Sequence, residues 1–569
     1  MRTVIILLLT AAVAPAADPP KAKLAELVKL YKAYELPPPP TDAKLYREAF
    51  KEGGRGGPPP PPRIGFGLKP DKDGVSTEFL VGCVTDRFSA EFTTEIPPEI
   101  KHIAADQIHL TTVVQFHLRG WTDLAEAAFT RGGHWKDKPE LALAGPAWRY
   151  WLNKLHDPAV DRALILRRMA SAQQAYPDGF RDDESEMLYV DLRKSLLPSR
   201  AKPGTVEALI DEWLDITEFF TPTPSDERYE AVVRQGFDAV PALIDALTDT
   251  RLSRGSRSTF GGLGSGPVRY RIRDYAEDIL RGFMYEGERF AEEEEGIGLD
   301  IEAVRKWWAT VSKANEEEYV VSRVLKVAEG EYLPNEHLLT VIRHKYPKRL
   351  PTLFRKVLTD HPDRDIHSVA YAVATSTLPK ETKRELLLEA VASKDLYRQL
   401  YGRMFLYDVD PERFHQIVID ELSKLPNTPN EPYHVCREAA FAQDVLRTDD
   451  AKVWAAAEKY VRRADAGIRL EWLREFARSG QPPEVRRRCA EFVAQYLTDT
   501  AVRDATAEPK LYPGGYAGYP DFKVIEVRNY AAYSLSYMLE VKGKPTAKWS
   551  ADEWAKFRDE VAKAVKSAK

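Results

Sequence analysis

The segment Tyr270–Met284 (YRIRDYAEDILRGFM) decides the fold, because its apolar residues recur at the spacing of an amphipathic helix. A shorter segment of the same character, Ala239–Leu247 (AVPALIDAL), precedes it across a long loop rich in glycine and arginine. Two helices joined in this way form a hairpin, and successive hairpins bury their apolar faces against one another. The sequence therefore predicts helix-on-helix packing in this region.

Comparable segments follow along most of the chain, separated by short turns that contain Pro, Gly or Asp. They are Leu350–Leu358 with Ile366–Thr375, Lys383–Ala392 with Leu396–Tyr407, and then Phe414–Leu422, Val435–Leu446, Ala451–Arg462, Ile468–Ala477 and Glu484–Leu497. Only residues 63–100 have a β pattern, which predicts a small hairpin or lid. We therefore expect a mainly α fold, an α-solenoid or irregular array of helix hairpins with a small N-terminal β element.

An internal echo supports a repeated unit. Ile272–Ala276 (IRDYA) recurs as Val527–Ala531 (VRNYA), and each copy is followed by a pair of tryptophans. A glycine-rich stretch precedes each copy, Gly255–Gly266 in the first and Gly514–Gly518 in the second. The shared flanking features indicate a structural repeat rather than a chance match.

The pair formed by Ala239–Leu247 and the helix with Arg273, Asp274, Ala276 and Leu280 resembles a HEAT-type helix pair. The build of the chain is also similar to that of large exported HEAT-repeat proteins of environmental bacteria. This resemblance implies an α-solenoid that presents an extended surface to partners, generally without catalysis. The resemblance covers this pair well, the C-terminal echo weakly, and other regions only by their helix-pair pattern. The long inserted loop 251–267 departs from the short turn that is typical of the family.

Composition excludes several classes of protein. The 569 residues include 82 Lys and Arg against 87 Asp and Glu, a formal net charge of −5, which argues against a general nucleic-acid binder. A mean hydropathy of −0.42 excludes a polytopic membrane protein. The three cysteines, Cys83, Cys436 and Cys489, are too few for a disulfide framework.

The N-terminus has the pattern of a secretory signal. Met1-Arg2 is followed by the apolar stretch Val4–Val13 and by Ala14-Pro15-Ala16, a small-x-small cleavage pattern. We expect cleavage after Ala16 and an exported protein, periplasmic or extracellular, without a membrane span.

The predicted organisation has seven parts. They are a signal peptide at 1–16, a Pro/Gly-rich tether with one short helix at 17–62, the β element at 63–100, an N-terminal helical region at 101–225, a HEAT-like unit with the long Arg/Gly loop at 226–315, a helix-hairpin array at 316–505, and a C-terminal HEAT-like unit with a Tyr/Gly loop at 506–569.

Two loops are candidate partner-binding sites. Six arginines and no lysine lie between Arg251 and Arg273, and a glutamate run follows at Glu286–Glu295. The arginines either pair internally or form a patch for an anionic partner, since guanidinium forks suit carboxylate and phosphate. The candidate residues are Arg251, Arg254, Arg257, Arg269 and Arg271 in the first loop, and Tyr512, Tyr516 and Tyr519 in the second.

No motif indicates catalysis, a metal or a cofactor. The glycine-rich stretch Gly261–Gly266 lacks the Gly-Lys-Ser/Thr of a phosphate-binding loop. His337 and His344 share a helix face without a metal-binding motif, and we expect ordinary packed histidines. We expect a non-enzymatic scaffold for protein partners, with a polysaccharide as the less favoured partner. The alternative is an all-α glycosidase or polysaccharide lyase, with candidate carboxylates such as Asp182, Asp183, Glu184 and Glu186.

Overall fold

The structure is a computed structural model, and two compact units can be distinguished in it. It describes residues 20–48, 63–67, 75–76, 79–81, 84–86, 90–96, 108–131, 139–177, 183–217, 226–257, 268–284, 299–325, 336–360, 366–429, 437–477, 483–507, 522–539, 541, 543, 545–546 and 548–567. Unit 1 comprises residues 1–222 and 248–275, and unit 2 comprises residues 223–247 and 276–569. The helices outnumber the strands greatly in the described part, so the predicted mainly α fold with a small β element is confirmed.

Unit 1 contains an antiparallel sheet of six short strands in the order β3-β6-β1-β2-β4-β5. The strands are β1 (Lys44–Glu48), β2 (Ile64–Gly67), β3 (Val75–Ser76), β4 (Phe79–Val81), β5 (Val84–Asp86) and β6 (Ala90–Glu95). In the register of β1 and β2, Leu45 lies opposite Phe66, and both side chains are buried. The β element is thus larger than the hairpin that the sequence predicts, because residues 63–100 supply the five strands β2 to β6 and β1 joins them from the segment before.

The first six helices of unit 1 pack around one hydrophobic core, and a seventh, α7, follows them in the chain. They are α1 (Pro20–Ala33), α2 (Leu110–Leu118), α3 (Thr122–Arg131), α4 (Pro139–Asn153), α5 (Arg162–Ala175), α6 (Asp183–Lys194) and α7 (Val206–Asp211). Helix α1 contacts α2, α3 and α4, and its residues Leu24, Leu27 and Tyr31 are buried in that core. The Tyr31 hydroxyl donates a hydrogen bond to the carbonyl of Pro37 (2.7 Å).

The structure thus differs from the predicted tether at 17–62. In its described part, α1 and β1 belong to the core of unit 1, because Tyr31, Leu45 and their neighbours bury their apolar side chains there. The proline run 37–40 is held by Tyr31 and by Arg119, whose Nη1 donates to the carbonyl of Pro40 (2.5 Å). The predicted short helix is thus present as α1, and the described part of the segment is anchored to unit 1, whereas residues 17–19 and 49–62 lie outside the described residues.

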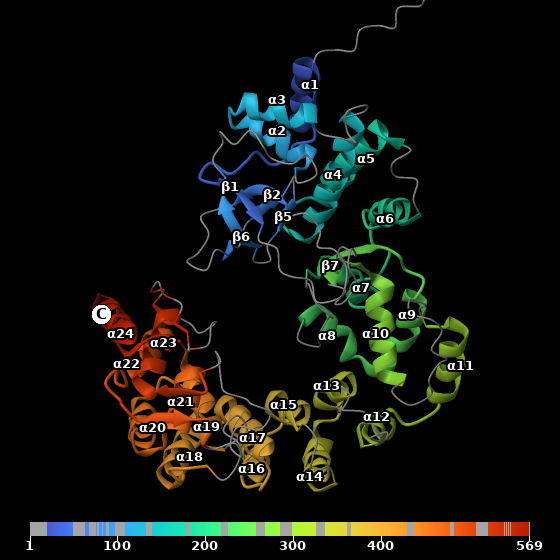
Figure 1. Cartoon of the computed structure of the whole chain (residues 1–569). Coiled ribbons are helices and arrows are strands. Elements are labelled where there is room, and N and C mark those ends of the chain that lie inside the picture. Colours follow the sequence, from blue (N-terminus) through green and yellow to red (C-terminus); the bar gives the residue numbers. More distant parts are fainter. Residues whose placement is uncertain are drawn as a thin grey trace, which may run out of the picture. The chain divides into compact units, whose positions relative to one another are not determined.

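Unit 2 is a succession of packed helices, drawn from green to red in Figure 1. They are α8 (Glu227–Val233), α9 (Val240–Ala246), α11 (Ile301–Val311), α12 (Glu316–Leu325), α13 (Glu336–Lys345), α14 (Leu350–Asp360), α15 (His367–Thr375), α16 (Lys380–Val391), α17 (Leu396–Val409), α18 (Pro411–Lys424), α19 (Arg437–Leu446), α20 (Ala451–Arg463), α21 (Ala466–Phe476), α22 (Pro483–Ala494), α23 (Val527–Met538) and α24 (Ala551–Ser567). Helix α10 (Ile272–Met284) begins in the residues of unit 1 and ends in those of unit 2.

The helices of unit 2 contact one another in a regular order. From α12 to α24 each helix packs against the next, apart from a short helical turn between α13 and α14. The odd-numbered helices also pack against one another in sequence, α13 on α15, α15 on α17, α17 on α19, α19 on α21 and α21 on α23. We call these six helices the odd row. Contacts between near neighbours in sequence are the pattern of a helical repeat array.

The internal echo corresponds to a repeated local structure. In the first copy the strands β7 (Leu252–Arg257) and β8 (Val268–Arg271) pair and lead directly into α10, and in the second β9 (Val502–Asp504) and β10 (Val524–Glu526) pair and lead into α23. The amide of Ile272 donates to the carbonyl of Arg251 (3.0 Å), and that of Val527 donates to the carbonyl of Ala501 (2.8 Å). The two copies are therefore one structural module used twice.

A glycine in α17 allows close packing of two helices. A Cβ on Gly402 would lie 2.9 Å from the backbone nitrogen of Val391 and 3.0 Å from Cβ of Ala390 in α16. We expect Gly402→Ala to lower the stability of unit 2 by about 1–3 kcal/mol, because the helix backbones must move apart. Thermal unfolding measures the change. Gly145→Ala in α4 is the control, since a Cβ there meets no atom within 4 Å; equal melting temperatures for both variants and wild type would contradict the close approach.

Candidate functional site

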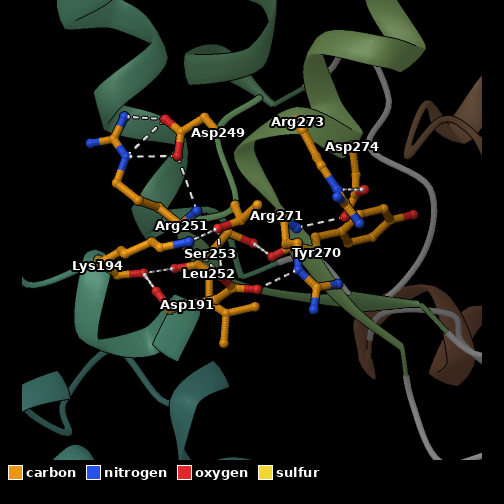
Figure 2. A network of polar contacts seen from close by, with 12 residues as sticks. Asp191, Lys194, Asp249, Arg251, Leu252, Ser253, Tyr270, Arg271, Arg273 and Asp274 are labelled. Carbon is orange, nitrogen blue, oxygen red and sulfur yellow. Dashed lines mark hydrogen bonds and ion pairs between the residues drawn. The ribbon is translucent and has the colours of Figure 1, made fainter. Parts of the chain in front are cut away.

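The predicted arginine site lies on the β7–β8 hairpin of unit 1. In its antiparallel register Leu252 lies opposite Arg271, and Ser256 lies opposite Arg269. Figure 2 shows the polar network at the base of the hairpin, where Arg251, Arg271 and Arg273 meet carboxylates. Arg251 contacts the nearby Asp249 and Asp211 of α7, Arg271 contacts Asp191 of α6, and Arg273 contacts the adjacent Asp274. Asp211 and Asp191 are therefore far in sequence from the arginines that they pair with.

Arg271 is paired with a buried carboxylate. Its Nε donates to Oδ2 of Asp191 in α6 (2.8 Å). The other oxygen of Asp191 accepts hydrogen bonds from the hydroxyl of Thr250 (2.5 Å) and from Nζ of Lys194 (3.3 Å). Only 7% of the Asp191 side chain is exposed, so this network is internal to unit 1.

Arg251 is held by two aspartates. Its Nε and Nη2 contact the carboxylate of Asp249, and Nη2 also lies 2.6 Å from Oδ1 of Asp211. Burial by itself lowers the pKa of the Arg251 guanidinium, but the two carboxylates outweigh it and the net shift is upward. A guanidinium with this much negative charge around it has little attraction left for an anionic partner.

Arg254 connects β7 to the end of a helix. Its guanidinium donates to the carbonyls of Leu155 (3.0 Å), Asp157 (2.8 Å) and Val160 (3.1 Å). These carbonyls lie in or just after the 3-10 turn Lys154–His156 that follows α4, where the helical hydrogen-bonding pattern ends. The residue is 6% exposed, so Arg254 acts as a buried capping group.

Arg269 is buried with a neutral partner. Its Nη2 donates to Oδ1 of Asn153 (2.8 Å), and burial lowers the pKa of the guanidinium to about 10. No carboxylate of the described residues forms an ion pair with it. The residue is 5% exposed, which leaves little of it accessible to a macromolecular partner.

The remaining predicted residues cannot be placed. The side chain of Arg257, the tyrosines Tyr512, Tyr516 and Tyr519, and the glutamate run 286–295 lie outside the described residues. The four placed arginines of the predicted set are directed into unit 1, so their contacts favour a structural role. Partner binding by Arg257 and the three tyrosines stays a prediction.

A buried charged cluster lies near the tyrosine of the second copy of the module. In the first copy the hydroxyls of Tyr275 and Ser253 lie 2.9 Å apart. In the second copy Tyr530 takes the place of Tyr275, and burial raises its pKa, with a further contribution from the nearby carboxylate of Glu471. Nη2 of Arg474 lies 2.7 Å from Glu471 and 3.3 Å from Glu475, which are both nearly fully buried. This cluster lies inside unit 2, where buried charges are costly unless they are paired.

A polar cluster joins α8 to α13. Glu230 of α8 pairs with Arg343 (2.6 Å) and lies 2.8 Å from Nε2 of His344. The Tyr229 hydroxyl donates to the carboxylate of Asp278 (2.5 Å) and lies 2.8 Å from Nε2 of His337. The two histidines that share a helix face in the sequence thus contact residues more than a hundred positions away, which no local motif indicates.

The cluster makes the stability of unit 2 depend on pH. Burial lowers the pKa of His344 below its ordinary value, and the hydrogen bond with Glu230 offsets only part of this effect. The unfolded chain therefore takes up the proton first, and the contribution of His344 to stability is lost as the pH falls below about 6.5. We expect a lower melting temperature of unit 2 at pH 5.5 than at pH 7.5, and a smaller difference for His344→Gln. An equal difference in both proteins would contradict this assignment.

The described residues show no further chemical signature. They contain no group of three or more His, Cys, Asp or Glu side chains suited to a metal ion. No helix among them is both long and apolar enough to cross a membrane. No family model matches the sequence, and neither a curated protein nor a solved structure matches it. The roles of the residues therefore follow from their contacts alone.

Proposed function

We propose that the chain is an exported, non-enzymatic scaffold of HEAT-like helix hairpins that binds protein partners through unit 2. The order of contacts in the odd row carries this proposal, because helices that pack one after another present a continuous series of side chains. A surface of this kind binds by shape and charge over a large area and requires no reacting groups.

The contacts in unit 1 argue for placing the binding surface in unit 2. Arg251, Arg254, Arg269 and Arg271 contact carboxylates, carbonyls and an amide of their own unit. A patch for an anionic partner would need exposed guanidinium groups. The proposal therefore assigns these four arginines to stability and leaves Arg257 and the tyrosine loop as secondary binding candidates.

The alternative, a carbohydrate-active enzyme, has less support. It requires two carboxylates that reach the substrate in one cleft. Glu471 and Glu475 approach a common guanidinium, but they are only 2% and 5% exposed. Side chains so deeply buried are unsuited to act on a glycan, so this pair does not favour the enzyme.

The proposal is tested by capture of partners with the full chain as bait, followed by chemical cross-linking and mass spectrometry. The bait is isolated from the exported fraction, in which we expect the signal peptide 1–16 to have been removed and the chain to begin at residue 17. We expect a reproducible protein partner whose cross-links fall on the odd row. We also expect Arg254→Ala to capture this partner as well as wild type does, when equal amounts of folded protein are compared. Turnover of a neutral or acidic polysaccharide by the purified chain would contradict the scaffold function.

A further inference from the structure

The second copy of the hairpin module lacks the cover that the first copy has. In both copies the first residue of the first strand lies opposite the last residue of the second strand, Leu252 opposite Arg271 and Val502 opposite Glu526. Leu252 is fully buried, whereas Val502 is 52% exposed. Val524, on the same face of the second hairpin, is 54% exposed. Equivalent faces of one module are therefore buried in unit 1 and exposed in unit 2.

A helix supplies part of the cover in the first copy. Helix α6 contacts β7, and Leu192 of α6 belongs to the same hydrophobic core as Leu252. The hydroxyl of Ser195, directly after α6, donates to the carbonyl of Leu252 (3.0 Å). The carboxylate of Asp191 pairs with Arg271, as Figure 2 shows. The chain thus contains an example of a helix that fits the outer face of this hairpin.

A second side of α6 is exposed and apolar. Met187 is 52% exposed and Val190 is 40% exposed, and their separation of three positions puts them on one helix face. Leu197, in the turn after the helix, is 63% exposed. Apolar side chains that gather on one exposed face mark interaction surfaces, whereas scattered ones are ordinary. We call Met187, Val190 and Leu197 the outer face of α6.

The exposed hairpin face has acidic and basic groups at its rim. Glu526 stands where the first copy has Arg271, and its side chain is 33% exposed beside Arg528, with which it pairs. Asp504 lies opposite Val524 and is partly exposed. We call Val502, Val524, Asp504 and Glu526 the second hairpin face. Lys523 is exposed next to it.

The outer side of α6 offers charges that complement this rim. Arg193 is exposed near the C-terminal end of the helix, and Glu186 is exposed near its N-terminal end. In the first module the helix supplies the carboxylate of Asp191 and the hairpin supplies the guanidinium of Arg271. In the second module the hairpin supplies carboxylates, so Arg193 has the matching sign. Charge pairs at a rim select the partner and its orientation more than they add affinity.

We propose that the outer face of α6 in one copy of the chain packs on the second hairpin face of another copy. The contact is heterologous, because two different surfaces meet, and it can therefore repeat from one copy to the next. This self-association goes beyond the partner binding assigned to the odd row and uses other residues. Residues 178–182 and 508–521, which adjoin the two faces in sequence, lie outside the described residues, so the test changes described residues only.

The test is sedimentation velocity of the full chain at about 1–100 µM, since an interface of this size is expected to be weak. We expect the weight-average mass of wild type to rise with concentration beyond that of a dimer. Val524→Asp and Val190→Asp are each expected to stay monomeric, because each lacks one of the two faces. Their equimolar mixture is expected to form 1:1 dimers and nothing larger, since each variant supplies the face that the other lacks.

Tyr397→Asp is the matched control. Tyr397 in α17 is 57% exposed and lies outside both faces, so this variant is expected to associate as wild type does. Thermal unfolding of each variant verifies its fold.

Five results would overturn the proposal. A wild-type chain that stays monomeric over the whole range would do so, as would association that Val524→Asp leaves intact. Association abolished by Val524→Asp but not by Val190→Asp would show that two hairpin faces pair with each other. A mixture of the two variants without dimers would show that the two faces do not meet. Equal loss in Tyr397→Asp would assign the association to another surface.

Discussion

Changing Asp444 to alanine is expected to lower the stability of unit 2 by about 3–5 kcal/mol, because it leaves the guanidinium of Arg403 buried without its carboxylate. Nε of Arg403 donates to Oδ2 of Asp444 (2.6 Å), and the two side chains are only 1% and 0% exposed. Arg403 also lies 4.2 Å from the ring centroid of Phe441. Urea unfolding followed by circular dichroism, with hydrogen exchange of α17 and α19, measures the loss.

The double variant Arg403→Met with Asp444→Leu is the matched control. It removes both charges and keeps an apolar volume, so we expect it to recover most of the stability lost in the single variant. Nη2 of Arg403 and Oδ1 of Asp444 have no hydrogen-bond partner among the described residues, so little further hydrogen bonding is lost. If Asp444→Ala were as stable as wild type, the pair of Arg403 and Asp444 would be hydrated in solution, and the expected loss of stability would be wrong.

Arg254→Met is expected to destabilise unit 1 by about 3 kcal/mol or more, since it leaves the carbonyls of Leu155, Asp157 and Val160 without their common donor. The methionine keeps most of the buried apolar volume, so the effect measures the lost hydrogen bonds and the lost ion pair with Asp215 rather than a cavity. Differential scanning calorimetry of the full chain measures the change in the transition of unit 1.

Arg273→Ala is the control, because its side chain is 45% exposed and pairs at 3.6 Å with the neighbouring Asp274. We expect a change in stability of less than about 1 kcal/mol for this exposed pair. If Arg254→Met kept the wild-type stability but lost partner binding, the arginines would form a binding patch, and the structural role assigned to Arg254 would be wrong.

Local patterns predicted the helices well because apolar spacing depends on near neighbours in sequence. The segment Tyr270–Met284 begins two residues before α10, and the IRDYA and VRNYA echo marks a module that the structure contains twice. A stronger signal was present and was missed. Leu-Thr-Asp-Thr occurs at 247–250 and again at 497–500, and in each copy the Asp carboxylate accepts from the amide two residues on. This turn sets the entry to both hairpins.

The apolar spacing of residues 24–31 predicted the short helix, but the surrounding prolines led us to expect this helix within a tether. Leu24, Leu27 and Tyr31 do lie on one helix face, and that face is buried. A short amphipathic helix flanked by prolines can therefore belong to a core, and its apolar face is the feature that should decide.

The partners of the arginines could not be derived from sequence distance. The nearest run of acids follows the loop at 286–295, whereas the structure pairs Arg271 with Asp191 and Arg251 with Asp211. Contacts between α8 and α13, such as Glu230 with Arg343, likewise join residues separated by more than a hundred positions.

The central claim, that unit 2 binds a partner through the odd row, is tested most directly by hydrogen–deuterium exchange of the full chain with and without a captured partner. The account predicts slower exchange in α13, α15 and α17 on binding, with the exchange of the β7–β8 hairpin unchanged. Protection confined to the hairpin 252–271, with no change in the odd row, would contradict it.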